Sequence, residues 1–376
     1  MISLEFLIVI ALALGATFFV IVVGIGLVIN KWAELSRTSG EERLYKYYSG
    51  MMADLLLQPL REPTDTNTVV QQYESILDPV KSGLSWSSRA RKNLHRAAIR
   101  NVLIDFSRDL TGESLDRLQF FFGSLGFVDE EVELLGRKQW WVRAQAARNL
   151  GLLRAHKSIP VLTAALKDDH EDVRNQAMQS LVVLAGVEAL QTIFKTTRGL
   201  SRWTTLELSV IVRQFEDRSI PYLIEALQYS DQSVVLFSIE MLAEIGFVSA
   251  VDSLVEMANS YPNVVIRSHA IEALGRLGDE RSEPLLHTLL VNPYPAIRSS
   301  AVRALERIGS PGSIDQLKVR ITEGDVQERI SAARALAKSG EAGLEQLRLF
   351  VHHPDSIAQG VALHVLEEAE GLQTLS

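Results

Sequence analysis

An internal repeat with a fixed period runs through most of this chain. Arg143 in "VRAQAARNLG" is followed at an interval of 31 by Arg174 in "VRNQAMQSLV", and Arg267 in "IRSHAIEALG" comes three such intervals after Arg174. Arg298 and Arg329 continue the series at the same interval. A fixed period of this length is typical of solenoids, in which one unit is too small to bury its apolar face without its neighbours.

Each repeat has the pattern of two short helices joined by a tight turn. In the first clear copy, Val142, Ala146 and Leu150 recur at helical spacing, which gives the first helix one apolar stripe. The second helix begins near a proline, as in "SIPVLTAALKD" and "SIPYLIEALQYSD", where a missing N–H costs little. We interpret glycines such as Gly151 and Gly246 as the turn between the two helices. The repeats therefore predict an all-α fold.

The pattern VRxxAxxxLG, a turn and then IPxLxxxLxD resembles the short HEAT-like repeats first associated with phycobilin lyases. The resemblance covers residues 140–376 and is loose over residues 200–259, where two copies keep the apolar spacing without the arginine. It implies an α-solenoid of about seven HEAT-like helical hairpins. It also implies a role in holding partners.

The N-terminus carries a long apolar stretch. From Phe6 to Ile29 the sequence has 24 consecutive uncharged residues, of which 17 are Phe, Leu, Ile or Val. At about 1.5 Å per residue this stretch exceeds the roughly 30 Å core of a bilayer. Only Glu5 precedes it, whereas a cleavable signal peptide has a basic start and a shorter apolar run. We expect residues 1–30 to be one transmembrane anchor.

Charge predicts the orientation of this anchor. Lys31, Arg37, Arg43 and Lys46 follow the apolar stretch, and no basic side chain precedes it. By the positive-inside tendency, the N-terminus lies outside and the rest of the chain is cytoplasmic. The expected location is the inner (plasma) membrane of a bacterium, as a single-pass protein.

Two regions separate the anchor from the repeats. Residues 31–85 are expected to be a juxtamembrane segment and linker, with the tyrosines of "LYKYY" near the membrane surface and one further helix over 69–79. Residues 86–139 are expected to form a helical cap on the solenoid. Four cations in this cap are spaced to share one side of a helix: Arg89, Lys92, Arg96 and Arg100. They either meet anionic lipid, at up to about 1 kcal/mol each, or are solvated or paired within the protein.

Composition excludes several classes of function. The formal net charge is −8, so nucleic acid is not an expected partner. The absence of cysteine excludes disulfides, thiolate zinc sites and a cysteine nucleophile. His352, His353, Asp355 and His364 match no strong metal-ligand spacing, and the part after the anchor has no phosphate-binding glycine loop and no GxSxG motif. We expect no catalytic residue, cofactor or metal site.

The candidate interaction residues are Trp140 and Trp141, which stand directly before the first clear repeat and are interpreted as having no counterpart in later repeats. Exposed tryptophan is favoured at binding hot spots, but both rings could instead pack against the preceding cap. The five repeat arginines are assigned to structure, with acidic or carbonyl partners: Arg143, Arg174, Arg267, Arg298 and Arg329.

Three functions compete at this stage. The favoured one is a non-catalytic, membrane-anchored cytoplasmic scaffold whose solenoid binds a protein partner, for which an envelope or exopolysaccharide glycosyltransferase is a candidate. The second, taken from the resemblance, is a phycobilin-lyase-like enzyme or chaperone. The third is a membrane-surface sensor whose basic helix binds anionic lipid.

Overall fold

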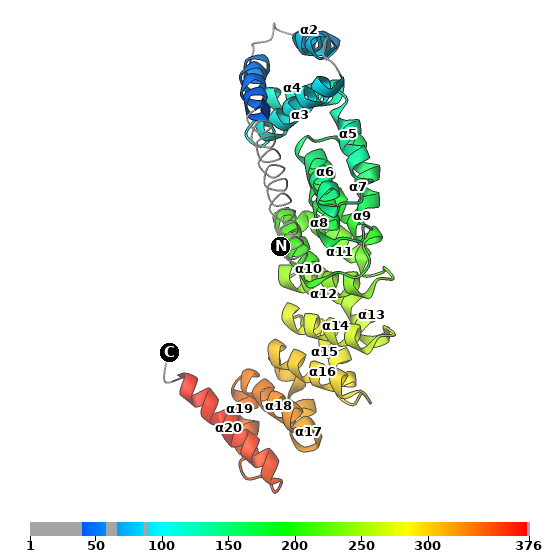
Figure 1. The fold of residues 1–376 in the computed structure, drawn as a ribbon. Helices are drawn as coiled ribbons and strands as arrows, with labels where there is room; N and C mark the ends of the chain where they lie inside the picture. Colours follow the sequence, from blue (N-terminus) through cyan, green and yellow to red (C-terminus); the bar gives the residue numbers. More distant parts are fainter. Residues whose placement is uncertain (1–39, 58–65, 86–88, 374–376) are drawn as a thin grey trace, which may run out of the picture. The chain divides into compact units, whose positions relative to one another are not determined.

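The computed structural model describes residues 40–57, 66–85 and 89–373. Every regular element in these ranges is a helix, and most helices are short and follow one another as hairpins (Figure 1), so the predicted all-α solenoid is confirmed. The chain divides into two compact units, residues 1–161 (unit 1) and residues 162–376 (unit 2).

The predicted transmembrane helix, Phe6–Ile29, lies outside the described residues. Among the described residues, one stretch, Glu171–Thr196, is long and apolar enough to cross a membrane, and half of its most apolar window is buried. Gly186, with φ of 62°, divides this stretch into two helices of one hairpin. Its buried apolar side chains belong to the core of unit 2.

Unit 1 is a bundle of helices around an aromatic core. It contains a helix over residues 40–57, α2 (Thr66–Ser85), α3 (Arg89–Phe106), α4 (Glu113–Ser124), α5 (Phe127–Leu134) and α6 (Trp140–Leu152). Phe121, Phe122 and Leu103 are completely buried in its core, together with Met52 of the first helix. Residues 40–57 thus belong to a packed bundle, although a juxtamembrane segment was expected over this range.

The tyrosines of this first helix were expected near the membrane surface, and the structure gives two of them other surroundings. Tyr48 is buried, and its hydroxyl lies 2.6 Å from Nδ1 of His95. Tyr45 donates a hydrogen bond of 2.9 Å to the carboxylate of Asp105. Only Tyr47 among the three is an exposed aromatic side chain. Polar partners inside the bundle therefore hold two of the three tyrosines in place.

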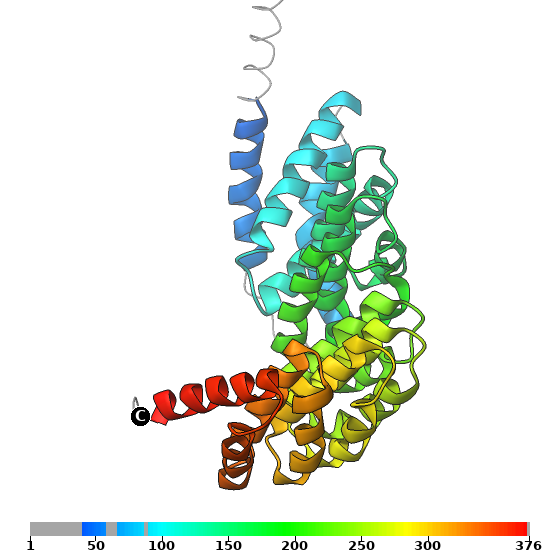
Figure 2. The ribbon, with the colours of Figure 1, turned by 90° about the horizontal axis from the view of Figure 1, so that it is seen from below.

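Unit 2 is a stack of six helical hairpins followed by one terminal helix, and α7 (Ile159–Ala165) spans the boundary between the units. The hairpins are α8 (Glu171–Ala185) with α9 (Ala189–Thr196), α10 (Arg202–Phe215) with α11 (Ile220–Ala226), α12 (Gln232–Ile245) with α13 (Val251–Ser260), α14 (Val264–Leu277) with α15 (Glu283–Leu289), α16 (Pro295–Ile308) with α17 (Ile314–Glu323), and α18 (Val326–Lys338) with α19 (Glu341–Phe350). The last helix, α20 (Ser356–Gln373), extends beyond the hairpin before it in Figure 2.

Three of the turns inside these hairpins use left-handed backbone. Gly246, Gly278 and Gly309 end α12, α14 and α16 with φ of 77°, 69° and 66°. Glycine adopts this conformation without a Cβ penalty. Glu216 follows α10 with φ of 50° and ψ of −133°, a sparsely populated conformation that costs a residue with a side chain on the order of 1 to 3 kcal/mol.

Another glycine of the repeat serves close packing between helices. Gly275 lies inside α14, and a Cβ built on it would stand 2.6 Å from Cα of Ala304 in α16. The absence of a side chain therefore lets α14 and α16 approach closely. Gly151 holds the same repeat position, four repeat intervals earlier, and lies inside α6. The prediction that Gly151 marks a turn is wrong.

Candidate partner-binding surface

The two tryptophans singled out from the sequence form an edge-to-face pair at the start of α6. Their ring centroids lie 6.0 Å apart with an interplanar angle of 87°. Trp140 is 38% exposed and Trp141 is 58% exposed. Both rings are thus partly covered and partly exposed. Trp141 in particular presents most of an indole to solvent.

A second and larger apolar surface lies on α10 in unit 2. Trp203, Leu206 and Val210 are 57%, 57% and 60% exposed, and their spacing of three and four residues places them on one side of the helix. We call these three residues the α10 stripe. Exposed apolar residues that occur singly need no explanation, but three on one helix face are typical of an interaction surface.

The α10 stripe arises because this helix is apolar on two sides. Leu208, Val212 and Phe215 face the interior and are buried. An ordinary surface helix has one apolar stripe of this kind and a polar opposite face. The α10 helix carries a second apolar row where the neighbouring repeats have polar side chains, such as Gln179 in α8 and Glu240 in α12.

The repeat register could have revealed this site in the sequence. Trp203 follows Trp141 by twice the repeat interval, and each is the second residue of its helix. The interpretation that Trp141 has no counterpart in later repeats is therefore wrong. The counterpart is missed when the repeats are aligned on the arginine, because α10 has Thr205 at that position.

The repeat arginines bind the backbone of the turn that precedes their own helix. Arg143, Arg174 and Arg298 each donate from Nη1 to the carbonyl oxygens five and six residues earlier, at 2.8 to 3.4 Å. Arg329 donates from Nε to the carbonyl five residues earlier at 2.7 Å, and Arg267 to the carbonyl nine residues earlier at 2.9 Å. Their guanidinium groups thus satisfy carbonyls in the turn after the preceding helix or, for Arg267 and Arg329, at the end of that helix.

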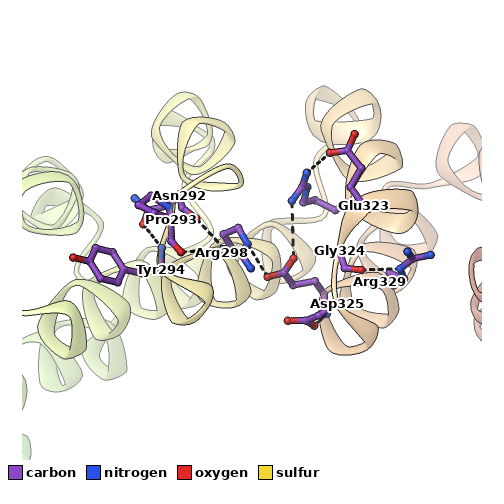
Figure 3. A network of polar contacts seen from close by, with 10 residues as sticks. Asn292, Pro293, Tyr294, Arg298, Glu323, Gly324, Asp325 and Arg329 are labelled. Atoms are coloured by element: carbon purple, nitrogen blue, oxygen red, sulfur yellow. Dashed lines mark hydrogen bonds and ion pairs between the residues drawn. The ribbon is translucent and has the colours of Figure 1, made fainter.

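One of these arginines joins a buried ionic network (Figure 3). The carboxylate of Glu328 in α18 is 1% exposed; it accepts a 3.1 Å hydrogen bond from Nε of Arg298 and lies 4.0 Å from Nη1 of Arg320. Arg320 also donates to Glu323 at 2.8 Å. A Cβ on Gly324 would stand 2.9 Å from Cβ of Glu328, so glycine makes room for this carboxylate. The network links α16, α17 and α18.

The predicted basic helix is α3, and part of its charge is used inside unit 1. Arg96 donates to the carboxylate of Glu130 and stacks over the ring of Phe127, with its guanidinium carbon 4.7 Å from the ring centroid. Nε of Arg100 lies 3.7 Å from the carboxylate of Glu131. The alternative of pairing within the protein therefore holds for two of the four cations. Lys92 is exposed, and the side chain of Arg89 lies outside the described residues.

The partner of Arg100 is a buried carboxylate. The side chain of Glu131 is 1% exposed, and burial raises the pKa of Glu131, while the charge of Arg100 and the amide of Asn149 oppose this rise. An acid whose pKa is higher in the folded state stabilises the fold below its unfolded pKa of 4.5, and this stability is lost as the pH rises through the folded pKa.

We therefore expect Glu131→Gln to stabilise unit 1 at pH 7, by about 1 kcal/mol, because the amide removes a buried charge. The advantage should shrink toward pH 4, where the carboxyl group is protonated. Thermal unfolding of both proteins between pH 4 and pH 8 measures it, with the exposed Glu133→Gln on the same helix as the control. A variant less stable than the parent at pH 7 would show that the ion pair with Arg100 outweighs the burial of charge.

Two groups of residues resemble catalytic or metal sites but have structural contacts. Oγ of Ser313 lies 2.8 Å from Nε2 of His287 and 3.1 Å from the carboxylate of Glu283. Ser313 is 1% exposed, and the same place in another hairpin holds the buried Ser282, which bonds to a backbone carbonyl. The Ser313 hydroxyl thus lies in the packed interior of its hairpin. The described residues contain no group of three or more His, Asp or Glu placed to hold a metal ion.

The histidines near the C-terminus have partners of their own. Nδ1 of His353 accepts a hydrogen bond from the backbone N–H of Asp355 at 3.1 Å. The carboxylate of Asp355 is bound by Arg329, which holds the pKa of that carboxyl below its usual range. His364 lies 3.2 Å from Glu368, one turn along the same helix. His353, Asp355 and His364 therefore contact separate partners and are not gathered into one candidate metal site.

Comparison with known proteins supports the repeat assignment. Two segments, residues 128–197 and 259–337, match the family model of HEAT repeats. They contain the copies in which the sequence pattern is clearest, so HEAT repeats are confirmed there. No curated protein matches the sequence.

Several solved structures are similar over most of this chain. An engineered protein is 19% identical, with a TM-score of 0.37, over 86% of this chain and 98% of its own. Kap121p bound to Ste12p is 13% identical, with a TM-score of 0.34, over 86% of this chain and 45% of its own. Human deoxyhypusine hydroxylase in complex with glycerol is 15% identical, with a TM-score of 0.29, over 80% of this chain and 98% of its own. The chain thus spans less than half of Kap121p.

Proposed function

We propose that this chain is a non-catalytic scaffold that binds a protein partner through its HEAT-repeat solenoid at the cytoplasmic face of a bacterial inner membrane. The observation that carries the proposal is the α10 stripe, in which three apolar side chains are each more than half exposed on one helix. A stacked array of hairpins supplies an extended and rigid support for such a surface. Trp141 adds a further exposed aromatic residue in unit 1.

The membrane attachment is proposed from the sequence. The apolar stretch Phe6–Ile29 is long enough to span a bilayer, and the basic residues that follow it favour a cytoplasmic solenoid. A partner that lies in or on the same membrane would meet the solenoid at a raised local concentration. A glycosyltransferase of envelope or exopolysaccharide synthesis is a partner of this kind, and gene neighbourhood tests that assignment.

Co-purification from membranes tests the scaffold. The full chain is expected to retain one or two stoichiometric partner proteins after extraction in mild detergent. A chain that ends at Val161, and so keeps unit 1 but lacks unit 2, is expected to lose them. Recovery of the same proteins by the shortened chain would show that unit 2 is not the binding element.

A further inference from the structure

We propose that helix α6 and the segments beside it form a basic, aromatic surface that lies on the anionic headgroups of the membrane. We call it the α6 surface, and it comprises one exposed tryptophan and five exposed cations: Trp141, Arg137, Lys138, Arg148, Arg154 and Lys157. The inference rests on the proposed function in taking the chain to be anchored in a membrane. It adds a second membrane contact and the class of lipid that this contact requires.

One side of α6 is exposed to solvent and carries no carboxylate. Trp141, Gln145 and Arg148 are exposed and follow one another at intervals of four and three residues, so they share this side of the helix. Small and apolar residues on the other side, among them Ala147 and Leu150, are completely buried. The exposed side is therefore a convex row that holds an aromatic ring, an amide and a guanidinium group.

Exposed cations also stand at both ends of α6. Arg137 and Lys138 precede the helix, and Arg154 and Lys157 follow it. Residues 134–161 contain no aspartate or glutamate. None of the five cations of the α6 surface forms an ion pair with any part of the chain that the structure describes. Their positive charge is thus available to an anionic partner.

The acidic residues next to this segment in the sequence lie on α5, and half of them are used inside unit 1. One of the four pairs with Arg96, and another is buried beside Arg100. Glu133 is exposed and lines one cleft together with Arg137, while Asp129 is exposed in the first turn of α5. These two exposed carboxylates reduce the positive charge at this edge, but they do not cancel the five cations.

The short tether to the predicted anchor selects a membrane among the possible anionic partners. The anchor is expected to end at residue 30, and the first helix of unit 1 begins at residue 40. Ten residues of chain span at most about 35 Å. Unit 1 therefore stays within reach of the headgroups whenever the anchor is inserted, at a high effective concentration. An acidic protein or a nucleic acid must instead arrive by diffusion.

The tryptophan favours the same partner. Indole rings are enriched at the membrane–water interface, and lysine and arginine near the surface are attracted to anionic lipid. Trp141, at 58% exposure, shares one helix side with Arg148, and such a side can lie flat in the interface. Trp141 then contacts lipid, and the α10 stripe stays the surface for the protein partner.

A single thiol tests the proposal, because the chain has no cysteine of its own. Gln145→Cys carries an environment-sensitive fluorophore in the full chain, placed in nanodiscs of phosphatidylcholine with or without one third phosphatidylglycerol. Quenching by nitroxide-labelled lipid measures the approach of the label to the bilayer. We expect quenching at least about two-fold stronger with the anionic lipid. The difference should vanish in 1 M salt, where the Debye length falls to about 3 Å.

Neutral variants of the labelled chain identify the groups responsible. The triple variant Lys138→Gln, Arg148→Gln and Lys157→Gln should abolish the difference between the two lipids. Trp141→Ala should weaken the quenching in anionic nanodiscs. All four residues are exposed, so the fold should be retained, and circular dichroism checks this.

A control with the same loss of charge uses exposed cations that already have acidic partners in unit 2. Lys195, Arg213 and Arg348 pair with carboxylates at 2.7 to 2.9 Å. Changing these three residues to glutamine should leave the difference between the lipids intact. Val291→Asp, at an apolar residue of unit 2 that is 74% exposed, should alter neither the quenching nor the retention of partner proteins.

Three results would overturn the membrane contact. These are equal quenching by the two lipid mixtures at low salt, a difference that survives the triple glutamine variant, and a label that responds to a polyglutamate peptide or an oligonucleotide but not to anionic lipid. Carbonate extraction judges the anchor separately. If carbonate releases the chain from membranes, the anchor and this inference both fall. If the chain stays and keeps its partners while the label does not respond, only the α6 surface is wrong.

Discussion

Gly275→Ala is expected to destabilise unit 2 by about 2 to 3 kcal/mol, the upper part of the range for overpacked cores. The added Cβ would stand 2.6 Å from Cα of Ala304 and 2.9 Å from its Cβ. Backbone atoms of a packed helix have no free space into which they can retreat, so α14 and α16 must move apart. Because α16 also packs on α18, this separation disturbs the stack on both sides of the change.

Gly360→Ala is the matched control, because Gly360 also lies inside a helix of unit 2 and has no atom within 4 Å of the built Cβ. Alanine there should raise stability by up to about 1 kcal/mol through helix propensity alone. Urea unfolding followed by circular dichroism measures both variants. If the two changes had the same effect, the close contact between α14 and α16 would not be a determinant of stability.

The second large effect is expected at the buried ionic network. Glu328→Ala should cost about 3 kcal/mol, the lower end of the range for a broken buried ion pair, because it removes the carboxylate that Arg298 and Arg320 share and leaves Arg298 without an anionic partner. Arg320, whose side chain is only 8% exposed, keeps its hydrogen bond to Glu323, and Arg298 keeps its bonds to the preceding carbonyls. The loss should uncouple α18 from α16 and α17.

A surface pair provides the comparison for this variant. Glu368 binds Arg334 at 2.9 Å, and both side chains are more than one third exposed. Glu368→Ala should therefore cost far less than Glu328→Ala, because water screens an exposed ion pair. Hydrogen exchange of the α16 to α18 amides, together with urea unfolding, separates the two cases. Equal stability of the Glu328→Ala and Glu368→Ala variants would mean that the buried network contributes no more than a surface ion pair.

The hairpins could be predicted because their signals are local and repeated. Helical spacing of apolar residues, prolines at the start of second helices and the fixed repeat interval all lie within a few residues of each element that they predict. The structure places α6 at Trp140, where the clear repeats begin, and it continues the hairpins to α20. The left-handed turns at Gly278 and Gly309 follow from the same periodicity.

The α10 stripe was missed because exposure depends on what the neighbouring helices cover. Leu206 and Leu208 are both leucines of one helix, yet the first is more than half exposed and the second is buried. Periodicity alone does not say which of two apolar rows faces the core. The sequence signal for this exposed row is that Trp203 and Trp141 occupy the same position in their repeats. It becomes visible only when the repeats are aligned on the first residues of their helices.

The ion pairs inside unit 1 also could not be predicted from the sequence. No local pattern joins Arg96 to Glu130, or Arg100 to Glu131, because each pair connects two helices that are far apart along the chain. The helical spacing of the cations on α3 was therefore compatible both with a free basic face and with pairing inside the protein. Charge spacing predicts which side chains share a side of a helix, but not which of them find acidic partners in a neighbouring helix.

The measurement that decides the proposed function is the amount of partner protein retained by the full chain after extraction from membranes. We expect one or two proteins at a constant molar ratio, lost when the chain ends at Val161 and unaffected by Val291→Asp. A full chain that retains no protein at a fixed ratio, or retains the same proteins without unit 2, would contradict the conclusion that this solenoid is a scaffold.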